Sequence, residues 1–249
     1  MFCPVEEVVI NIEWLPYCGA APAPLGLMER WNVDPILIAV MIAVAIVAHR
    51  YPAHFARRPA ASVLGVSAFL FISPFCALGS ALFTVRIIHD VILVAVLSPL
   101  IVATLRLHRR AVPGGLAAWT AAHALVFWFW HAPPAYDAAM SSDLAFWLMQ
   151  ASLVGTAAVW WAKVFRATVT ASTIALLATM VAMGVLGALL AFAPRAFYAP
   201  HWLTVQAWGL SPLEDQQIAG IVMWAPASLV YLLAALAILY HALGRRAAA

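Results

Sequence analysis

Three ionisable residues stand close together in a strongly apolar stretch of this chain. Arg86, His89 and Asp90 occur in "TVRIIHDVILVAVLSPLIV" with the spacing i, i+3 and i+4, so a helix would carry them on one face. We expect Arg86 and Asp90 to pair, because a charge at membrane depth needs a counter-charge. His89 is then either a hydrogen-bonding neighbour of that pair or a functional group, as a metal ligand or a proton relay.

A second histidine ends another apolar run, "HALVFWFWHAPPAYDAAM". His131 comes just before Ala132 and two prolines. Because the residue before a proline avoids helical angles, the helix is predicted to end at about His131. The ring then lies near the negative end of the helix dipole, which favours an imidazolium or a bound metal ion. The alternative is an interfacial histidine in an aromatic belt. His123, two turns deeper, is interpreted as a core histidine bonded to a neighbouring helix.

The segment "SPLEDQQIAGIVMWAPASLVYL" has the features of a helix start. Ser211 and Glu214 fit a capping box, and Asp215 suits the positive end of the helix dipole. Gly220 would permit close approach of another helix. Pro226 removes one backbone hydrogen bond, so a kink is predicted there.

The three cysteines, Cys3, Cys18 and Cys76, follow no metal-binding spacing such as CxxC. Cys3 and Cys18 lie in the N-terminal segment, where an oxidising compartment would allow a disulfide between them. Cys76 is either an inert buried thiol or a soft ligand for Cu(I).

The composition of the chain indicates whether these residues are surrounded by water or by lipid. Of 249 residues, 66% are hydrophobic and 9% charged, and the mean hydropathy is +0.97. Soluble domains carry roughly a quarter charged residues, so the solvent of this chain is largely lipid. Continuous apolar runs of about twenty residues indicate helices and exclude a barrel. The sequence therefore predicts an all-α integral membrane protein. No basic patch interleaved with aromatic residues suggests nucleic acid.

The apolar runs predict a bundle of seven transmembrane helices. Ten of the 13 basic residues fall on one side of this plan, and the ten acidic residues fall on or near the other. Since Lys and Arg are retained in the cytoplasm, the N-terminus is predicted outside and the C-terminus inside. The divisions are an extracytoplasmic segment 1–32, a transmembrane domain 33–241 and a cytoplasmic tail 242–249. The predicted helices cover 33–49, 61–82, 85–105, 116–131, 144–162, 170–193 and 212–240.

The chain has no phosphate-binding glycine loop, no nucleophile elbow and no HExxH pair. A hydrolase or ATPase thus has no residues to support it, and the chain is predicted not to be an enzyme.

Three stretches carry a resemblance to a family. "WHAPPAYDAAM", "VWW" and "PLEDQQIAGIVMW" are similar to the polytopic CtaG-type cytochrome c oxidase assembly factors, over about residues 31–240. The chain departs from the family at two places. His89-Asp90 stands where the family often has Gln-His or His-His, and Met149-Gln150 stands where it commonly has Glu-His. The family-motif positions outside the histidines are Arg86, Tyr136, Asp137, Asp215, Gln216, Gln217, Gly220, Met223 and Trp224.

The resemblance implies a seven-helix protein of the bacterial plasma membrane that helps haem-copper oxidases mature. On this basis we expect copper to be handled at the outer membrane face by His89 and His131, with Asp90, Met149 or Cys76 completing the ligand set. Imidazole with a thioether or thiolate suits Cu(I). The expected partners are oxidase subunits, a periplasmic copper chaperone and the lipid bilayer. Two alternatives remain: a transporter of copper or another small solute, and a metal-free scaffold that contacts an oxidase.

Overall fold

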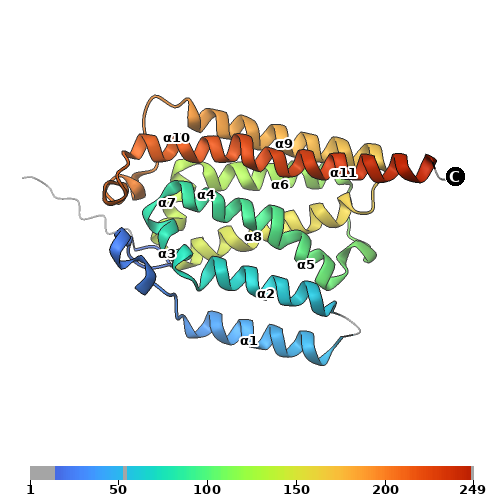
Figure 1. Ribbon diagram of the computed structural model, residues 1–249, viewed down its shortest axis with the longest axis horizontal. Coiled ribbons are helices and arrows are strands. Elements are labelled where there is room, and N and C mark those ends of the chain that lie inside the picture. Colours follow the sequence, from blue (N-terminus) through green and yellow to red (C-terminus); the bar gives the residue numbers. More distant parts are fainter. Residues whose placement is uncertain (1–14, 53–54, 248–249) are drawn as a thin grey trace, which may run out of the picture.

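The structure is a computed structural model that describes residues 15–52 and 55–247; over those ranges it is helical and contains no strand. The long helices run side by side along the longest axis of the molecule (Figure 1). The α-helices are α1 (Pro35–Arg50), α2 (Arg57–Phe71), α3 (Pro74–Ala81), α4 (Phe83–Ile92), α5 (Ser98–Leu105), α6 (Leu116–His131), α7 (Pro133–Ser141), α8 (Asp143–Val164), α9 (Val169–Ala191), α10 (Pro212–Val222) and α11 (Ser228–Ala247). Short 3-10 helices are η1 (Pro24–Glu29), η3 (Leu107–Arg109), η4 (Ala199–His201) and η5 (Val205–Trp208), and π-turns are η2 (Leu93–Leu97) and η6 (Met223–Ala227).

Several of these helices have the character of membrane spans. In the described ranges, four are long and apolar enough to cross a bilayer: Phe83–Leu105, Asp143–Val164, Val169–Ala191 and Pro212–Gly244. The bent pair of α2 and α3 makes a fifth if it is counted as one span. Helices α1 and α6 coincide with two further predicted spans, but each has only 16 residues. The last helix runs on to Ala247, beyond the predicted boundary at residue 241.

The prediction of one helix over 61–82 is wrong. The chain forms α2 and α3, which are bent by 44° at the break between them. The cause is local. Ser73 takes an extended conformation and its hydroxyl accepts a hydrogen bond from the Phe75 amide, while Pro74 occupies the first helical position. A second helix therefore starts where the first one ends.

The break predicted between the helices 116–131 and 144–162 is also wrong, because Pro133 and Pro134 begin a further helix there, α7. Proline is suited to the first turn, where its missing N–H would have no partner in the helix. Helix α6 does end at His131, as predicted, and Ala132 links the two helices in an extended conformation. The predicted loop 194–211 contains η4 and η5.

The two long spans with a proline in their interior each contain a short π-helical segment at or just before that proline. Pro226 lies inside η6, so the predicted disturbance of the last helix takes this form. Pro99 follows η2, and there the Ser98 hydroxyl donates a hydrogen bond to the carbonyl of Leu93 at 2.8 Å. The Leu93 carbonyl also accepts the Ser98 amide, whereas the Val94 carbonyl, five residues before Pro99, accepts from Nε1 of Trp161 on α8 at 2.8 Å. Trp161 therefore bonds a carbonyl for which Pro99 has no N–H to offer.

Close packing of α9 against α10 depends on glycine. A Cβ on Gly220 would lie 2.5 Å from the Ala191 nitrogen and 2.6 Å from the Gly187 oxygen. These are backbone atoms that cannot move aside cheaply, so the predicted role of Gly220 in helix approach is confirmed.

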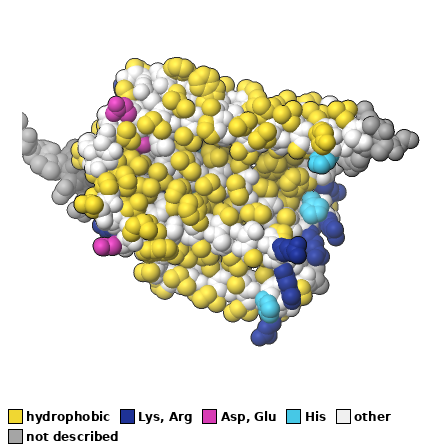
Figure 2. Space-filling view, in the orientation of Figure 1, with side chains coloured by type: hydrophobic (Ala, Val, Ile, Leu, Met, Phe, Trp, Pro, Cys, Tyr) yellow, Lys and Arg dark blue, Asp and Glu magenta, His cyan; other side chains and the backbone are white. Residues whose placement is uncertain are grey.

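The two ends of the bundle differ in charge. Lys and Arg side chains gather at the end where α5 and α11 finish, on the right of the view, and the visible acidic side chains lie at the opposite end (Figure 2). We call the first end the basic end; it includes the α5–α6 connection 106–115, the end of α8 and the α8–α9 connection 165–168. We call the other the site end; it includes the start of α4 and α10, the end of α6, and α7 and η4.

Candidate functional site

A carboxylate lies between two histidines at the site end. Asp90 of α4 places Oδ1 3.3 Å from Nδ1 of His89, and its Oδ2 lies 3.9 Å from Nε2 of His131 on α6. All three side chains are at most 2% exposed. The two histidines that the sequence predicts as a pair are therefore brought to the same carboxylate, from two helices.

The protonation of His131 is restricted by its backbone partner. Its Nδ1 lies 2.7 Å from the carbonyl oxygen of Phe127, which can only accept, so Nδ1 carries the proton. In a neutral ring Nε2 then has a lone pair, and that nitrogen has no hydrogen-bond partner; nor has Oδ2 of Asp90. Two electron-rich atoms thus face one another across 3.9 Å. This arrangement is unfavourable unless a proton or a cation sits between them.

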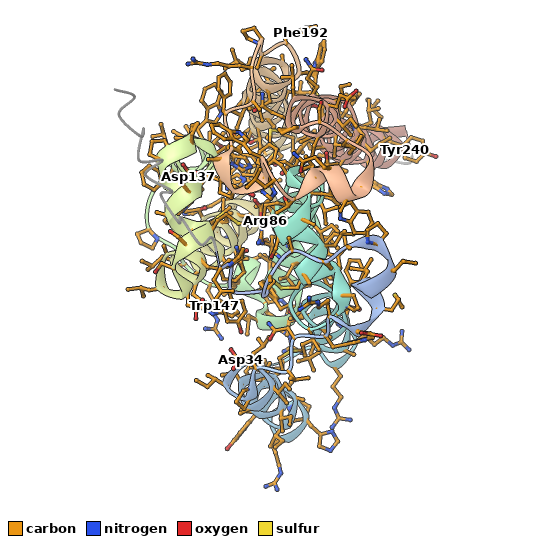
Figure 3. The ribbon with its side chains drawn as sticks, turned by 90° about the vertical axis from the view of Figure 1, so that its left-hand side faces the viewer. Asp34, Arg86, Asp137, Trp147, Phe192 and Tyr240 are labelled. Carbon is orange, nitrogen blue, oxygen red and sulfur yellow. A yellow bond between two sulfur atoms is a disulfide. The ribbon has the colours of Figure 1, made fainter. Side chains whose placement is uncertain are left out.

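Arg86 does not form the ion pair with Asp90 that the spacing predicts. Helical side chains lean toward the N-terminus of their helix, which carries the guanidinium away from a residue one turn further on. It packs over the ring of Phe146, 5.2 Å from the centroid, and Nη2 lies 3.8 Å from the Met140 sulfur. Figure 3 looks onto this end and shows Arg86 near the middle of the bundle. Its Nε and Nη1 have no partner.

A tyrosine–histidine pair, missed by the sequence analysis, lies close to this cluster. Tyr136 Oη is 2.7 Å from Nε2 of His201, and both side chains are buried. Burial lowers the pKa of His201 to about 3 and raises the pKa of Tyr136. The only signal for His201 was its position in the aromatic segment "FYAPHW" of a predicted loop. Tyr198, from the same segment, donates a hydrogen bond to the His131 carbonyl at 2.8 Å.

The motif that opens α10 serves the framework of the site. The predicted capping box of Ser211 and Glu214 is confirmed. Asp215 instead turns to the neighbouring helix, where it accepts hydrogen bonds from the backbone amides of Phe83 at 2.6 Å and Thr84 at 3.1 Å. It therefore caps the N-terminus of α4, the helix that carries Arg86, His89 and Asp90.

The remaining motif residues spread over several environments. The Gln216 side chain accepts from the Phe197 amide at 2.7 Å and so holds the 194–211 segment. Met223 is buried in η6, whereas Gln217 is partly exposed and Trp224 is 46% exposed. Asp137 is partly buried on α7, and this burial raises the pKa of its carboxyl group.

Met149 and Gln150 lie buried on α8, one turn beyond Phe146 on the same face of the helix. Both polar atoms of the Gln150 side chain lack a hydrogen-bond partner. A thioether and an unpaired amide thus continue the face that touches Arg86.

Cys76 is not a free thiol. It forms a disulfide with Cys18, so it is not a metal ligand in this state, and Cys18 is not paired with Cys3, which lies outside the described residues. The bond ties the segment before α1 to α3. Next to it, the Tyr17 ring stacks on Phe146 at 4.9 Å, which places this segment against the ring that carries Arg86.

The side chains of this cluster can be compared with the ligands that copper prefers. No group of three or more His, Cys, Asp or Glu with the arrangement of a metal site occurs in the described part of the chain. Two unpaired donors do face each other, Nε2 of His131 and Oδ2 of Asp90, and at 3.9 Å both could reach one ion at bond lengths of about 2 Å. Imidazole nitrogen is a donor that suits copper.

Comparison with family models adds the decisive observation. The model of the cytochrome c oxidase caa3 assembly factors, Caa3_CtaG, matches residues 39–245. The chain belongs to this family. The match covers all residues of the buried cluster, but Tyr17 and Cys18 precede it. The family description makes oxidase assembly the role of its members, as the sequence resemblance implied. The searches of curated proteins and of solved structures found no match.

Proposed function

We propose that this Caa3_CtaG protein helps a haem-copper cytochrome c oxidase mature by handling copper at its site end. The observation that carries the proposal is the carboxylate of Asp90 between His89 and His131, with two unpaired donors 3.9 Å apart. Those three side chains would hold the ion, and the thioether of Met149 on the adjacent helix α8 would be an additional soft donor. Bound copper would be cargo for the oxidase, so the protein needs no catalytic residue.

The proposed setting is the bacterial plasma membrane, crossed seven times with the N-terminus outside. Two observations support this direction. Lys and Arg gather at the basic end, as expected for the cytoplasmic side (Figure 2). The disulfide of Cys18 and Cys76 lies at the opposite end, and disulfides persist in oxidising compartments such as the periplasm.

The burial of the proposed copper ligands restricts how partner proteins can deliver or receive the ion. His89, Asp90 and His131 are at most 2% exposed, so copper can enter or leave only when this end of the bundle opens. A periplasmic copper chaperone on one side of the transfer and an oxidase subunit on the other are the partners we propose. Either could supply donors that this chain lacks.

The test is copper retention by the purified full-length protein. Wild type, His131→Ala, His89→Ala and the double variant are incubated with Cu(I) without oxygen, desalted and analysed for metal. We expect wild type to retain copper and the double variant to lose it. His123→Ala is the matched control, because His123 is an equally buried histidine on the same helix, away from Asp90. Oxidase activity in a deletion strain complemented by each variant should follow the same order.

A metal-free scaffold is the second candidate, and the closed packing of the site favours it. Arg86, Asp90 and Tyr136 would then be a structural polar core that shapes a surface for an oxidase subunit. If wild type holds no more copper than the double variant while oxidase assembly still needs the protein, the scaffold function replaces the copper function. Copper uptake into proteoliposomes would instead indicate a transporter.

A further inference from the structure

A cavity lies at the basic end, far along the bundle from the proposed copper site. It has a volume of about 350 Å³ and is bounded by the α5–α6 connection and the end of α8. Its lining combines cations with apolar side chains: Lys163 and Arg166 from α8 and the turn after it, Arg110 from the connection, and Leu107, Val112 and Leu116. The cavity therefore offers both positive charge and a hydrophobic wall.

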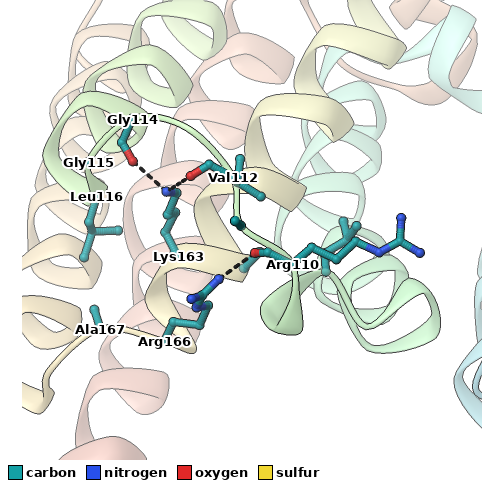
Figure 4. A pocket seen from close by; sticks show the side chains of 11 residues that line it. Arg110, Val112, Gly114, Gly115, Leu116, Lys163, Arg166 and Ala167 are labelled. Carbon is teal, nitrogen blue, oxygen red and sulfur yellow. Dashed lines mark hydrogen bonds between the residues drawn. The ribbon is translucent and has the colours of Figure 1, made fainter.

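The two cations from the α8 side are held in place by backbone carbonyls. Lys163 Nζ donates to the carbonyls of Val112 and Gly114, the latter at 2.6 Å, and Arg166 Nη1 donates to the Arg110 carbonyl at 2.5 Å (Figure 4). These bonds explain how the connection is tied to α8. They also leave donors over, because an ammonium has three N–H groups and a guanidinium has five.

No carboxylate of the described residues neutralises the charge of Lys163 and Arg166. Both ion pairs found among the described residues involve Asp90 at the site end, and neither Lys163 nor Arg166 has a carboxylate within 4.0 Å in that part of the chain. A neutral carbonyl satisfies a donor but leaves the positive charge. A cluster of cations at the membrane interface with free donors and no counter-charge attracts an anion.

The apolar part of the lining selects the kind of anion. Leu107, Val112 and Leu116 line the same cavity as the cations, and α6 and α8 continue from it into the apolar body of the bundle. A phosphate that carries acyl chains can place its charge against Lys163 and Arg166 and its chains along this surface. A free phosphate would gain nothing from the apolar wall.

We propose that this cavity binds the phosphate headgroup of an anionic phospholipid. The lipid would fasten the α5–α6 connection to α8 at the membrane surface. This inference is independent of copper and concerns residues that the copper proposal does not use.

The experiment is native mass spectrometry of the full-length protein in detergent, titrated with phosphatidylglycerol, phosphatidylcholine or inorganic phosphate. We expect phosphatidylglycerol to be retained in preference to phosphatidylcholine. Arg166→Gln should weaken its binding about five-fold, the effect of roughly one basic residue at a membrane surface, and Arg166→Lys should restore most of it. Arg109→Gln, which removes a neighbouring exposed charge outside the cavity lining, should change binding less than two-fold.

Two further outcomes decide the proposal. Ala167→Phe fills the cavity and keeps every charge, so it should also weaken phosphatidylglycerol binding if the cavity is the site, and it serves if Arg166→Gln does not fold. Equal losses in Arg109→Gln and Arg166→Gln would mean unspecific attraction and overturn the proposal. So would retention of phosphatidylcholine to the same extent, or displacement of the lipid by inorganic phosphate.

Discussion

The two ends of this bundle treat charged side chains in opposite ways. At the site end, Arg86, Asp90 and Asp215 are withdrawn from the surface, and their contacts cross from one helix to another. At the basic end, Arg166 is exposed and Lys163 is only partly buried, and both bind carbonyls of a nearby connection. The comparison shows that the two ends differ in how far their charged groups are buried. At the site end the charged groups are buried and incompletely paired. Burying such groups costs free energy of folding, so they are candidates for a functional role.

The largest expected difference between the ends concerns Asp215. Asp215→Ala leaves the amides of Phe83 and Thr84 without their carboxylate, and hydrogen bonds to a charged group are worth about 1.5 to 3 kcal/mol each. We expect the free energy of unfolding to fall by about 3 to 6 kcal/mol. Glu214→Ala, which removes only the exposed capping box, should cost about 1 kcal/mol. Equal losses in the two variants, measured by thermal unfolding in detergent, would contradict the bridging role of Asp215.

The disulfide should have the next largest effect. Cys18→Ser removes a cross-link between residues 58 positions apart and should lower the free energy of unfolding by about 2 to 4 kcal/mol. Reduction of wild type should produce the same loss, and reductant should not change the variant further. The bond is tested directly by thiol alkylation: reaction of Cys18 and Cys76 with a maleimide before reduction would show that they are not paired.

Acidification should weaken the site end through His201. The pKa of His201 is about 3 in the folded protein, against about 6.5 in an unfolded chain, so the unfolded state takes up the proton first. The stabilisation from a neutral His201 is complete above pH 6.5 and is lost as the pH falls toward 3. Between pH 7 and pH 5 the loss amounts to about 2 kcal/mol. His201→Gln should flatten this dependence of the melting temperature, and a dependence as steep as that of wild type would contradict the role of His201.

The smallest effect is expected at the basic end. Lys163→Gln removes the ammonium that donates to two carbonyls, but these groups lie close to water, which can replace it. The free energy of unfolding should fall by no more than about 1 kcal/mol. A loss as large as that of Asp215→Ala in the same unfolding assay would remove the contrast between the two ends.

Much of the helical framework could be predicted from local sequence. Helix α6 ends at His131 because prolines follow, and the capping box at Ser211 acts over three residues. Local sequence was also informative where the prediction failed. Pro74 was placed inside one predicted helix and Pro133 in a break between two, although proline is suited to a first helical turn, and both residues begin new helices.

The sequence by itself thus determined which segments are apolar helices, where the charges fall along the chain and which family the motifs resemble, since these depend on residues near one another. Only the tertiary structure decided which side chains contact one another. Asp90 meets His131 rather than Arg86, Asp215 caps a helix more than 130 residues away, Tyr136 meets His201, and Cys18 bonds to Cys76. The physical reason is that a buried polar group takes whichever partner the packing of helices brings within reach, and spacing along one helix cannot state which helix will be its neighbour.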